Sequence, residues 1–253
     1  MEGMIFAAGI GSRLKPFTDY HPKALAPIGR NGLTALDITL IAMIKAGVRH
    51  VVVNVHHFAE QITEHLRSMT LPGIEVSISD ESDLLLDTGG GLVKAAPLFT
   101  GKENILVHNV DIIEDLDLRQ MEADLESRPG SLAALLATDR RTSRYFLFDC
   151  EARLRGWENI TKDIYRGEGI DAQSASSLIA LAFGGIHVIR PEMLSLLKEY
   201  EPEGTPFSIT DFYIDTCRDH TYTAWSGTGE PFRWHDIGTP EKLELTTLDF
   251  PEY

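Results

Sequence analysis

The stretch Phe6-Ala7-Ala8-Gly9-Ile10-Gly11-Ser12-Arg13-Leu14-Lys15-Pro16-Phe17-Thr18, followed by Pro22-Lys23, decides the fold of this chain. The apolar run 4–8 at its start predicts a buried strand that ends in a glycine loop. Glycines in such a place let the main chain approach a phosphate and turn N–H groups toward it, and Arg13 adds a planar cation with several donors. The loop therefore predicts an anion site, although a tight turn with solvated cations explains two glycines equally well.

Two better-known glycine loops are excluded by spacing. A dinucleotide-binding fingerprint needs a third glycine at position 14, where Leu14 stands. A Walker loop needs Gly-Lys followed by Ser or Thr, which this stretch does not contain. The anion site therefore belongs to neither class.

Charge is distributed unevenly along the chain. The 253 residues carry 23 Lys and Arg against 38 Asp and Glu, a formal net charge of −15. The overall acidity argues against a protein that coats nucleic acid or anchors on anionic lipid, whereas a small cationic island suits one small polyanion. Such an island exists in the first thirty residues, where the charged side chains are Arg13, Lys15, Lys23 and Arg30 against Glu2 and Asp19.

Length predicts one large domain or one and a half, because domains average roughly 150 residues, and a sizeable core is available because 43% of this chain is hydrophobic. Cys150 and Cys217 stand alone, so neither a disulfide framework nor a zinc site is expected. A reducing cytoplasm fits these cysteines. No signal peptide is expected, and the longest apolar stretch, 178–189, is shorter than the roughly 18 residues of a membrane span.

Strand and helix patterns alternate through the first 110 residues. A break is expected at 88–91, before another short helical stretch. The alternation predicts an α/β fold with a doubly wound, mostly parallel sheet. A β-branched run predicts a strand over 51–55, alternation predicts one over 74–78, and an apolar run predicts one over 105–107. Apolar residues at helical spacing predict helices from Leu36 and from Phe58.

The rhythm changes beyond Asp111, where several strands follow one another with few helices between them. No Pro- or Ser-rich linker precedes this part, so we expect a smaller subregion built onto the same domain. The expected strands cover 132–137, 145–148, 154–157, 178–183, 186–189, 222–225 and 232–234, and the expected helices cover 191–200, 209–216 and 240–248.

A longer pattern joins these observations. The order Ala-Ala-Gly-x-Gly-x-Arg-x-x-Pro-x-Thr, with Pro22-Lys23 after it, resembles the signature of the sugar-1-phosphate nucleotidyltransferases, also called nucleoside diphosphate sugar pyrophosphorylases. Compact length, the segment 54–57 and a triple glycine are most similar to the N-acetylmuramate-1-phosphate uridylyltransferase and mannose-1-phosphate guanylyltransferase branches. The resemblance continues through Asp87-Thr88-Gly89-Gly90-Gly91, Asn109-Val110-Asp111, Phe183-Gly184-Gly185-Ile186 and the segment 234–240.

The resemblance implies a Rossmann-like nucleotidyltransferase fold that spans 1–253 as a single domain. Its nucleotide-binding core would cover 1–111, mainly sugar-side residues would cover 112–235, and a metal ligand with a closing helix would cover 236–253. The implied partners are a nucleoside triphosphate and a sugar 1-phosphate, without nucleic acid or membrane. The sequence leaves the nucleobase, the sugar and the oligomeric state open.

The resemblance also implies an enzyme of class EC 2.7.7, in which a sugar 1-phosphate attacks the α-phosphate of the triphosphate and pyrophosphate leaves. Arg13 would hold the β- and γ-phosphates, and Lys23 would neutralise the α-phosphate. Asp111 and Asp236 would hold the Mg²⁺ cofactor. Asp111 follows a strand at the edge where open α/β sheets bind ligands. On the residues alone, either aspartate can instead cap a helix or a turn.

The remaining contacts follow from the same resemblance. Glu81 would accept from the nucleobase, with an exposed acidic loop as the alternative. Relatives have a Glu-Lys-Pro segment at the sugar phosphate, and here Glu158 and Lys162 are the candidates, while Gly185 lies on the sugar-side strand. The expected nucleotide-binding set is Ala7, Ala8, Gly9, Gly11, Ser12, Arg13, Lys23, Glu81, Thr88, Gly89 and Asn109.

Other interpretations stay open at this point. His56 and His57 either line the nucleotide pocket or are solvated. Asp115-Leu116-Asp117 resembles a glycosyltransferase metal motif, but its place before a helical stretch favours helix capping. A cytidylyltransferase that uses phosphocholine and a nucleotide-sensing module without turnover are alternative functions.

Overall fold

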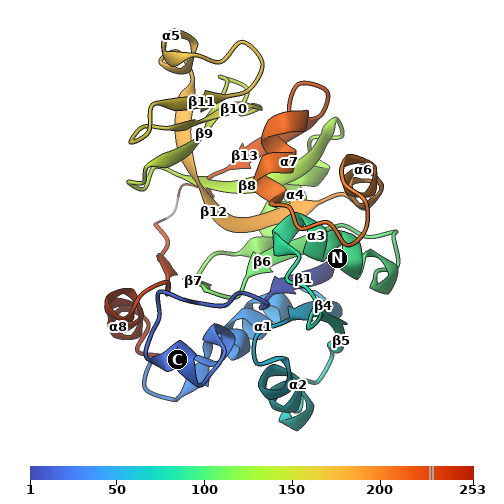
Figure 1. Cartoon of the computed structure of the whole chain (residues 1–253), viewed down its shortest axis with the longest axis vertical. Coiled ribbons are helices and arrows are strands. Elements are labelled where there is room, and N and C mark those ends of the chain that lie inside the picture. The colour runs from blue at the N-terminus through green and yellow to red at the C-terminus, as the bar shows by residue number, and fades with distance from the viewer. Residues whose placement is uncertain (228, 230) are drawn as a thin grey trace.

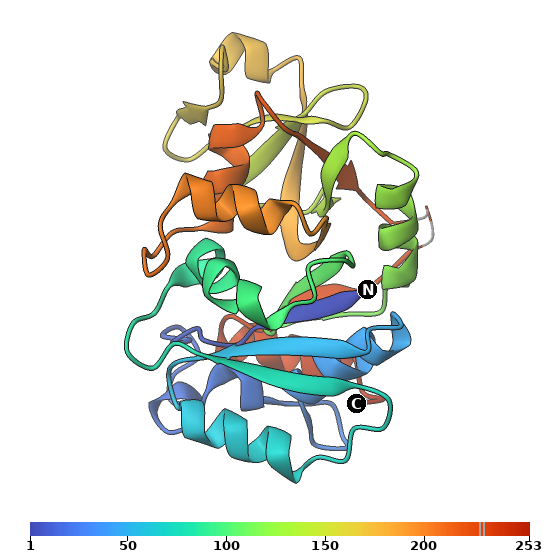
Figure 2. The same cartoon turned by 90° about the vertical axis from the view of Figure 1, so that its right-hand side faces the viewer.

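The chain forms a mixed sheet with helices on both faces, as a computed structural model shows (Figures 1 and 2). The structure describes residues 1–227, 229 and 231–253. The 10-stranded sheet has the order β11-β10-β9-β12-β6-β1-β4-β5, and β8 pairs with β12 and β13 off this path. Its strands are β1 Glu2–Phe6, β4 His50–Val55, β5 Glu75–Asp80, β6 Ile105–Asn109, β8 Ser131–Thr138, β9 Arg144–Phe148, β10 Leu154–Asn159, β11 Ile164–Arg166, β12 Ile179–Ile189 and β13 Thr221–Trp225.

Two short pairs and a set of helices complete the fold. The pairs are β2 Pro27–Ile28 with β3 Leu33–Thr34, and β7 Ile112–Glu114 with β14 Trp234–Asp236. Within the described part of the chain, no helix is both long and apolar enough to cross a bilayer. The helices are α1 Ala35–Lys45, α2 Ala59–Ser68, α3 Asp87–Ala95, α4 Leu118–Glu126, α5 Ala172–Ala175, α6 Met193–Tyr200, α7 Ile209–Thr216 and α8 Pro240–Asp249, with 3-10 turns η1 Phe17–Asp19, η2 Lys23–Leu25 and η3 Ala96–Leu98.

The first 109 residues build the parallel half of the sheet, which confirms the doubly wound α/β prediction. β6, β1, β4 and β5 lie side by side and pair in parallel. Successive strand residues point to opposite faces, so Met4 packs with Leu92 of α3 on one face while Ile5 packs with Leu36 of α1 on the other. Figure 2 shows α3 above these strands and α1 and α2 below them. The carboxyl ends of the parallel strands therefore open at one edge.

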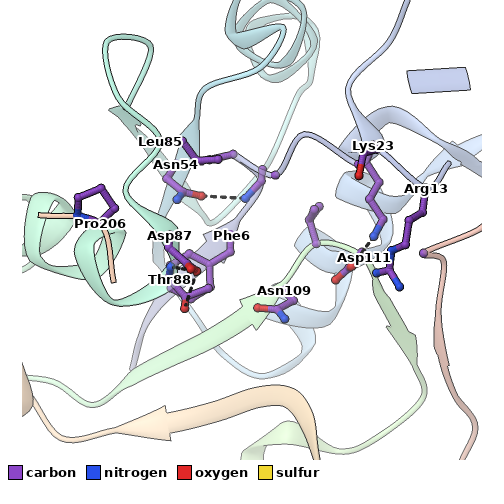
Figure 3. Close-up of a pocket in the computed structure, with 17 residues that line it drawn as sticks. Phe6, Arg13, Lys23, Asn54, Leu85, Asp87, Thr88, Asn109, Asp111 and Pro206 are labelled. Atoms are coloured by element: carbon purple, nitrogen blue, oxygen red, sulfur yellow. Dashed lines mark hydrogen bonds and ion pairs between the residues drawn. The ribbon is translucent and has the colours of Figure 1, made fainter. Parts of the chain in front are cut away.

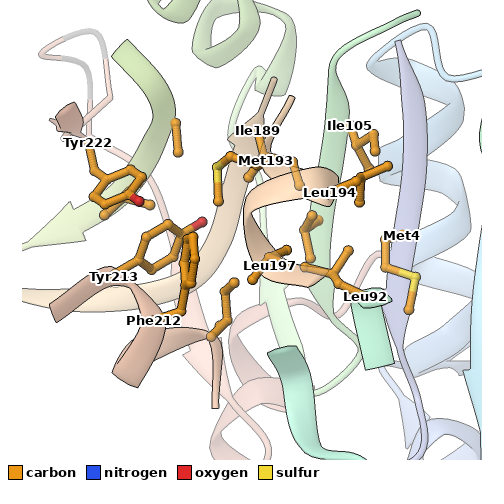
Figure 4. Packing of buried hydrophobic residues seen from close by; sticks show 14 of the residues in the cluster. Met4, Leu92, Ile105, Ile189, Met193, Leu194, Leu197, Phe212, Tyr213 and Tyr222 are labelled. Carbon is orange, nitrogen blue, oxygen red and sulfur yellow. The ribbon is translucent and has the colours of Figure 1, made fainter. Parts of the chain in front are cut away.

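The other half of the sheet is antiparallel. β12 pairs with β6, β8 and β9, and β9 continues to β10 and β11. Two strands were expected over 178–189, but one strand of 11 residues is found. Its register against β8 shifts between Phe183 and His187, because Gly184 and Gly185 let it bend there. Figure 4 shows α6 and α7 packing Leu197, Phe212 and Tyr213 toward Met4 and Leu92, which joins both halves through one core.

The expected break at 88–91 is wrong, because these residues lie inside α3. The three glycines are required by close approach of neighbouring groups. A Cβ on Gly89 would lie 2.2 Å from the Phe207 ring, and one on Gly90 would lie 2.5 Å from the Thr205 carbonyl oxygen. Glycine is a poor helix former, so packing rather than local preference makes this helix.

A smaller core lies under the glycine loop. Leu14, the residue that excludes the dinucleotide fingerprint, is 1% exposed there and packs with Ile38, Ile237 and Phe250. α8 begins with the N-cap Thr239 and with Pro240 in its first turn, as expected. Asp117 accepts a hydrogen bond from the Arg119 N–H at the start of α4, so the capping interpretation of the Asp-x-Asp segment is confirmed. The end of the chain thus supports the loop at its beginning.

Candidate active site

A cavity of about 570 Å³ opens at the carboxyl ends of β1 and β6, where the parallel strands meet the glycine loop. We call it the first cavity. Figure 3 shows Arg13, Lys23 and Asp111 at one end and Asn54, Leu85 and Pro206 at the other, so cations gather at one end only. It is lined by Phe6, Ala7, Ala8, Gly9, Gly11, Ser12, Arg13, Lys23, Asn54, Leu85, Asp87, Thr88, Asn109, Val110, Asp111, Pro206 and Gly238.

The glycine loop is fixed by its own side chains. Gly11 has a φ of +65°, which favours glycine, and a Cβ there would lie 3.0 Å from the Thr18 side chain. The Thr18 hydroxyl donates to the Gly11 carbonyl at 2.9 Å. Gly9 differs, because a Cβ there would meet no atom of the described residues within 4 Å. Gly11 is therefore needed by the fold, whereas Gly9 faces open space in the cavity.

An ion pair closes the charged end. Lys23, on the short turn η2, is 9% exposed and its Nζ donates to Asp111 Oδ2. Asp111 follows β6, and its carbonyl accepts from the Ile237 N–H at 2.9 Å, so the β7–β14 pair holds the segment of Asp236 beside it. Arg13 lies against Gly238. The chain therefore brings Arg13, Lys23 and Asp111 into the lining of the first cavity, while Asp236 does not line it and lies on the neighbouring strand β14, paired with Ile112.

The donor set fits a hard divalent cation that shares its ligands with a substrate. Across residues 1–227, 229 and 231–253, no three His, Cys, Asp or Glu side chains gather as a complete metal centre. Mg²⁺ commonly takes one or two carboxylates and completes its octahedron with phosphate oxygens and water. Burial acts to raise the pKa of Asp236, but its hydrogen bond from Lys242 at 2.5 Å and that lysine's charge outweigh burial, so the net pKa is lowered. Asp236 is therefore kept ionised.

Glu81 lies behind the first cavity rather than in it. It is 0% exposed, and its Oε1 accepts from Asn54 Nδ2 at 2.7 Å while Oε2 accepts from the Leu86 N–H. Asn54 in turn accepts from the Ala7 N–H at 2.8 Å. Burial is the largest effect on Glu81 and raises its pKa above the usual range. Glu81 thus orients Asn54 and the first residue of the loop, and is neither in contact with the cavity nor in an exposed acidic loop.

The opposite wall ties the two halves of the chain together. Asp87 has a φ of +59° and its carboxylate accepts from the Thr88 N–H. The Thr88 hydroxyl accepts from the Ile209 N–H at 2.9 Å, at the start of α7. The Gly89 N–H donates to the Phe207 carbonyl at 2.9 Å, so the first turn of α3 is held by the segment before α7. Asp87 therefore lies where the parallel part of the sheet, through α3, meets the antiparallel part, through α7.

A second cavity of about 740 Å³ lies beyond Asp87, which lines both. Its floor is one face of the antiparallel strands β9–β11, and α7 covers it. The pairing register of these strands determines which residues form the floor, because residues paired across neighbouring strands point to the same face of the sheet. It is lined by Asp87, Arg140, Thr142, Arg144, Phe146, Trp157, Asn159, Lys162, Ile164, Arg166, Phe183, Ser208, Thr210, Asp211 and Ile214.

Register also separates the two residues expected at the sugar phosphate. Arg144, Asn159 and Ile164 form one row across the strands, and all three line the second cavity. Glu158 pairs with Tyr145 and Tyr165 in the alternate row, on the opposite face. Lys162 lines the cavity from the turn after β10. The structure therefore brings Lys162 to the second cavity and places Glu158 away from it.

Most expected nucleotide contacts meet in the first cavity. Gly89 does not line it and packs on Phe207 instead. Gly185 has a φ of +75° and lies against Asn109 and Ile112, without lining either cavity. The residues brought together there are Ala7, Ala8, Gly9, Gly11, Ser12, Arg13, Lys23, Thr88, Asn109 and Asp111.

Some lining residues carry no motif that sequence reasoning can use. Leu85, Asp87 and Pro206 close the far end of the first cavity. Asp87 belongs to a segment of the signature, which was a usable signal, whereas Pro206 is an isolated residue in a long connection. His56 has a buried Nδ1 without a hydrogen-bond partner in the described structure, and neither His56 nor His57 lines a cavity.

The chain is similar to known proteins in both sequence and fold. The family model described as "Nucleotidyl transferase" matches residues 2–155. The chain is 27% identical over 94% of its length to an N-acetylmuramate alpha-1-phosphate uridylyltransferase of Caulobacter vibrioides, covering 92% of that protein. A protein of the same name from Neisseria meningitidis is 26% identical, with 96% of each chain covered. In fold, a UDP-glucose pyrophosphorylase solved with UDP-glucose superimposes with a TM-score of 0.77 at 14% identity, covering 100% of this chain and 99% of that one.

Proposed function

Because the chain belongs to the nucleotidyl transferase family, we propose that it joins a nucleoside triphosphate to a sugar 1-phosphate and releases pyrophosphate. The observation that carries the proposal is the first cavity, where the signature loop, Arg13 and the Lys23–Asp111 pair meet at one charged end. The second cavity opens next to it across Asp87. Two adjoining sites suit a reaction between two phosphorylated substrates.

The bond changes define what each residue does. An oxygen of the sugar phosphate bonds to the α-phosphorus, the bond from that phosphorus to the bridging oxygen breaks, and pyrophosphate leaves with the electron pair. Lys23 neutralises charge that builds on the α-phosphate, and Arg13 holds the β- and γ-phosphates and the departing pyrophosphate. Main-chain N–H groups of the loop hold the remaining phosphate oxygens.

Asp111 and Asp236 would hold Mg²⁺, which when bound neutralises and aligns the phosphates of both substrates. Lys23 is paired with Asp111 in the substrate-free chain. In this proposal a phosphate takes the place of that carboxylate on Lys23, which releases Asp111 for the cation. The hydrogen bond and positive charge of Lys242 lower the pKa of Asp236 and so keep its carboxylate ionised.

The nucleobase is assigned to the end of the first cavity without cations. Leu85 and Pro206 offer apolar surface to the faces of a base ring, and Thr88 and Asn54 offer polar atoms at its edge. Glu81 acts there through Asn54.

The names of the relatives make UTP and N-acetylmuramate 1-phosphate the first pair to test. Arg144 and Lys162 are exposed at the second cavity and suit the carboxylate that this sugar carries. We place the reaction in the cytoplasm, which suits a chain with unpaired Cys150 and Cys217.

The direct test is a pyrophosphate-release screen of the purified chain with Mg²⁺. It combines five triphosphates with glucose, mannose, N-acetylglucosamine and N-acetylmuramate 1-phosphates, and mass spectrometry identifies the nucleotide sugar. Choline phosphate in the same screen tests the alternative acceptor. Absence of pyrophosphate from every combination would overturn the proposal. Tight nucleotide binding without turnover would favour the sensing module.

A further inference from the structure

Arg140 is the one half-buried guanidinium of the second cavity that has no acidic hydrogen-bond partner in the described structure. It follows β8, and its side chain lies with Cζ 4.5 Å from the centre of the Trp234 ring. Nη2 donates to the Phe183 carbonyl at 3.0 Å. Nε is buried and has no hydrogen-bond partner among the described residues. Partial loss of water without a hydrogen-bonded counterion is unfavourable for a guanidinium, and an anionic ligand would offset that cost.

The other cations of this cavity differ from Arg140. Arg166 is neutralised by Asp211 and by Asp215, the latter at 2.9 Å. Arg144 and Lys162 are exposed, so water stabilises their charge. Burial lowers the pKa of Arg140, and the nearby charge of Asp236 opposes that shift. The demand for an anion is therefore concentrated at Arg140.

The position of Arg140 fits the reacting end of a sugar phosphate. Its ring partner Trp234 lies in β14, two residues before Asp236, and the Trp234 Nε1–H donates to the Gly184 carbonyl at 2.9 Å. Arg140 is thus held between the second cavity and the strand that carries Asp236. The charge of Asp236 acts on Arg140, so a phosphate bound by Arg140 lies on the Asp236 side of the second cavity.

We propose that Arg140 binds the phosphate of the sugar 1-phosphate and orients it for attack, in place of the Glu-Lys-Pro lysine that this chain lacks. The inference rests on the proposed function and adds a residue to it that no motif identifies. Nη2 of Arg140 bonds to the Phe183 carbonyl, whereas Nε has no hydrogen-bond partner among the described residues. The guanidinium therefore keeps donor capacity that charge-assisted hydrogen bonds to a phosphate would use.

The test compares Arg140→Met, Arg140→Lys and Arg141→Met in the full chain, using the sugar 1-phosphate that releases most pyrophosphate in the screen. Arg141 is exposed and lines neither cavity, so it is the matched control. We expect Arg140→Met to raise the KM for the sugar phosphate about thirtyfold, as for loss of a charge-assisted hydrogen bond, with the KM for the triphosphate within about twofold. Arg140→Lys recovers part of the loss.

A second readout separates phosphate binding from a structural role. The same sugar without its phosphate is used as a competitive inhibitor, and Arg140→Met is expected to leave its inhibition constant unchanged. An unchanged KM for the sugar phosphate overturns the inference, and so does an equal rise in both KM values accompanied by a lower unfolding temperature. If Arg140→Met does not fold, the same comparison of the KM for the sugar phosphate with the KM for the triphosphate is made on Arg140→Lys and tests the inference. A wild-type chain that turns over no substrate refutes the proposed function instead.

Discussion

The two cavities of this molecule are built from different kinds of structure. The first lies where parallel strands end, and most of its lining comes from one continuous loop and from segments that directly follow β1 and β6. The second has a floor of alternate residues from β9, β10 and β11, joined only by register. A loop needs a fixed order of residues, whereas a strand floor needs only a suitable side chain at every second position. Contiguous order therefore marks the first cavity, and the second carries almost no motif.

The largest expected effect comes from the charged end of the first cavity. Lys23→Met removes the cation that meets the α-phosphate, and kcat/KM is expected to fall about a thousandfold, as when an enzyme loses one donor to developing charge. Steady-state pyrophosphate release measures it. Lys15→Met is the control, because Lys15 is exposed and pairs with Asp19 at 2.9 Å, away from the first cavity. Similar activity in the two variants would contradict the assignment of Lys23.

The two glycines of the loop also test how the first cavity is built. The methyl group added by Gly9→Ala meets no atom of the described residues within 4 Å, so the unfolding temperature should not change. If a bound triphosphate lies close to this Cα, the methyl group should raise the KM for the triphosphate about tenfold, or roughly 1.4 kcal/mol. Gly11→Ala forces a left-handed residue, which costs roughly 1–2 kcal/mol of stability. Thermal unfolding and kinetics measured on both variants check this. A destabilised Gly9→Ala with normal kinetics would contradict it.

Register in the second cavity is tested by Glu158 and Lys162. Lys162→Ala removes an exposed cation from the cavity, and the KM for the sugar phosphate is expected to rise about fivefold, with a smaller effect at high salt. Glu158→Ala changes the opposite face and should leave that KM within about twofold. The measurement is initial-rate kinetics at two salt concentrations. The reverse result would place Glu158 at the sugar and would refute the alternation argument.

The smallest effect at neutral pH concerns His187, which stacks on Phe183 behind the second cavity. Burial, with the charge of His108, lowers the pKa of His187 to about 3 from 6.5. The unfolded chain therefore binds a proton that the folded chain refuses, and stability falls as pH drops below 6.5, by at most about 1.4 kcal/mol per pH unit. His187→Gln removes this dependence.

The check is the free energy of unfolding of the wild type and His187→Gln from pH 7.5 to 4.5. The difference between the two should change only below about pH 6.5. His220→Gln, on the turn before β13, is the control for adding glutamine in place of a histidine. Parallel curves for the wild type and His187→Gln would show that His187 is protonated in the folded chain.

Much of the fold and of the first cavity could be predicted from the sequence. Burial of Val51, Val52 and Val53 on both faces leaves an apolar run in the sequence, and the loop after β1 carries its chemistry in adjacent residues. The prediction of a break at 88–91 was wrong because the glycines are needed here for close packing against Phe207 and Thr205, and not to interrupt the helix. Local preference alone cannot show which distant residue lies against a glycine.

The rest of the site depends on register and burial, which are tertiary properties. Glu158 and Asn159 are neighbours in sequence, and only the pairing of β10 decides which one faces the second cavity. Glu81 follows β5 and looks like an acceptor for a ligand, but the partner that uses it is Asn54, 27 positions away. Arg140 has no motif around it, and its importance is visible only from its burial and its unpartnered Nε.

The glycines of α3 also constrain how this sequence can change over time. Position 89 has room for a side chain only if the aromatic ring at position 207 becomes smaller, because the two now compete for one space. Gly89→Ala and Phe207→Leu should therefore each be harmful alone and compensate each other when combined. Among related sequences, the two positions should vary together in size, although they lie in distant parts of the chain. Gly90 has no such escape, since its neighbour is the main-chain oxygen of Thr205, which every amino acid shares.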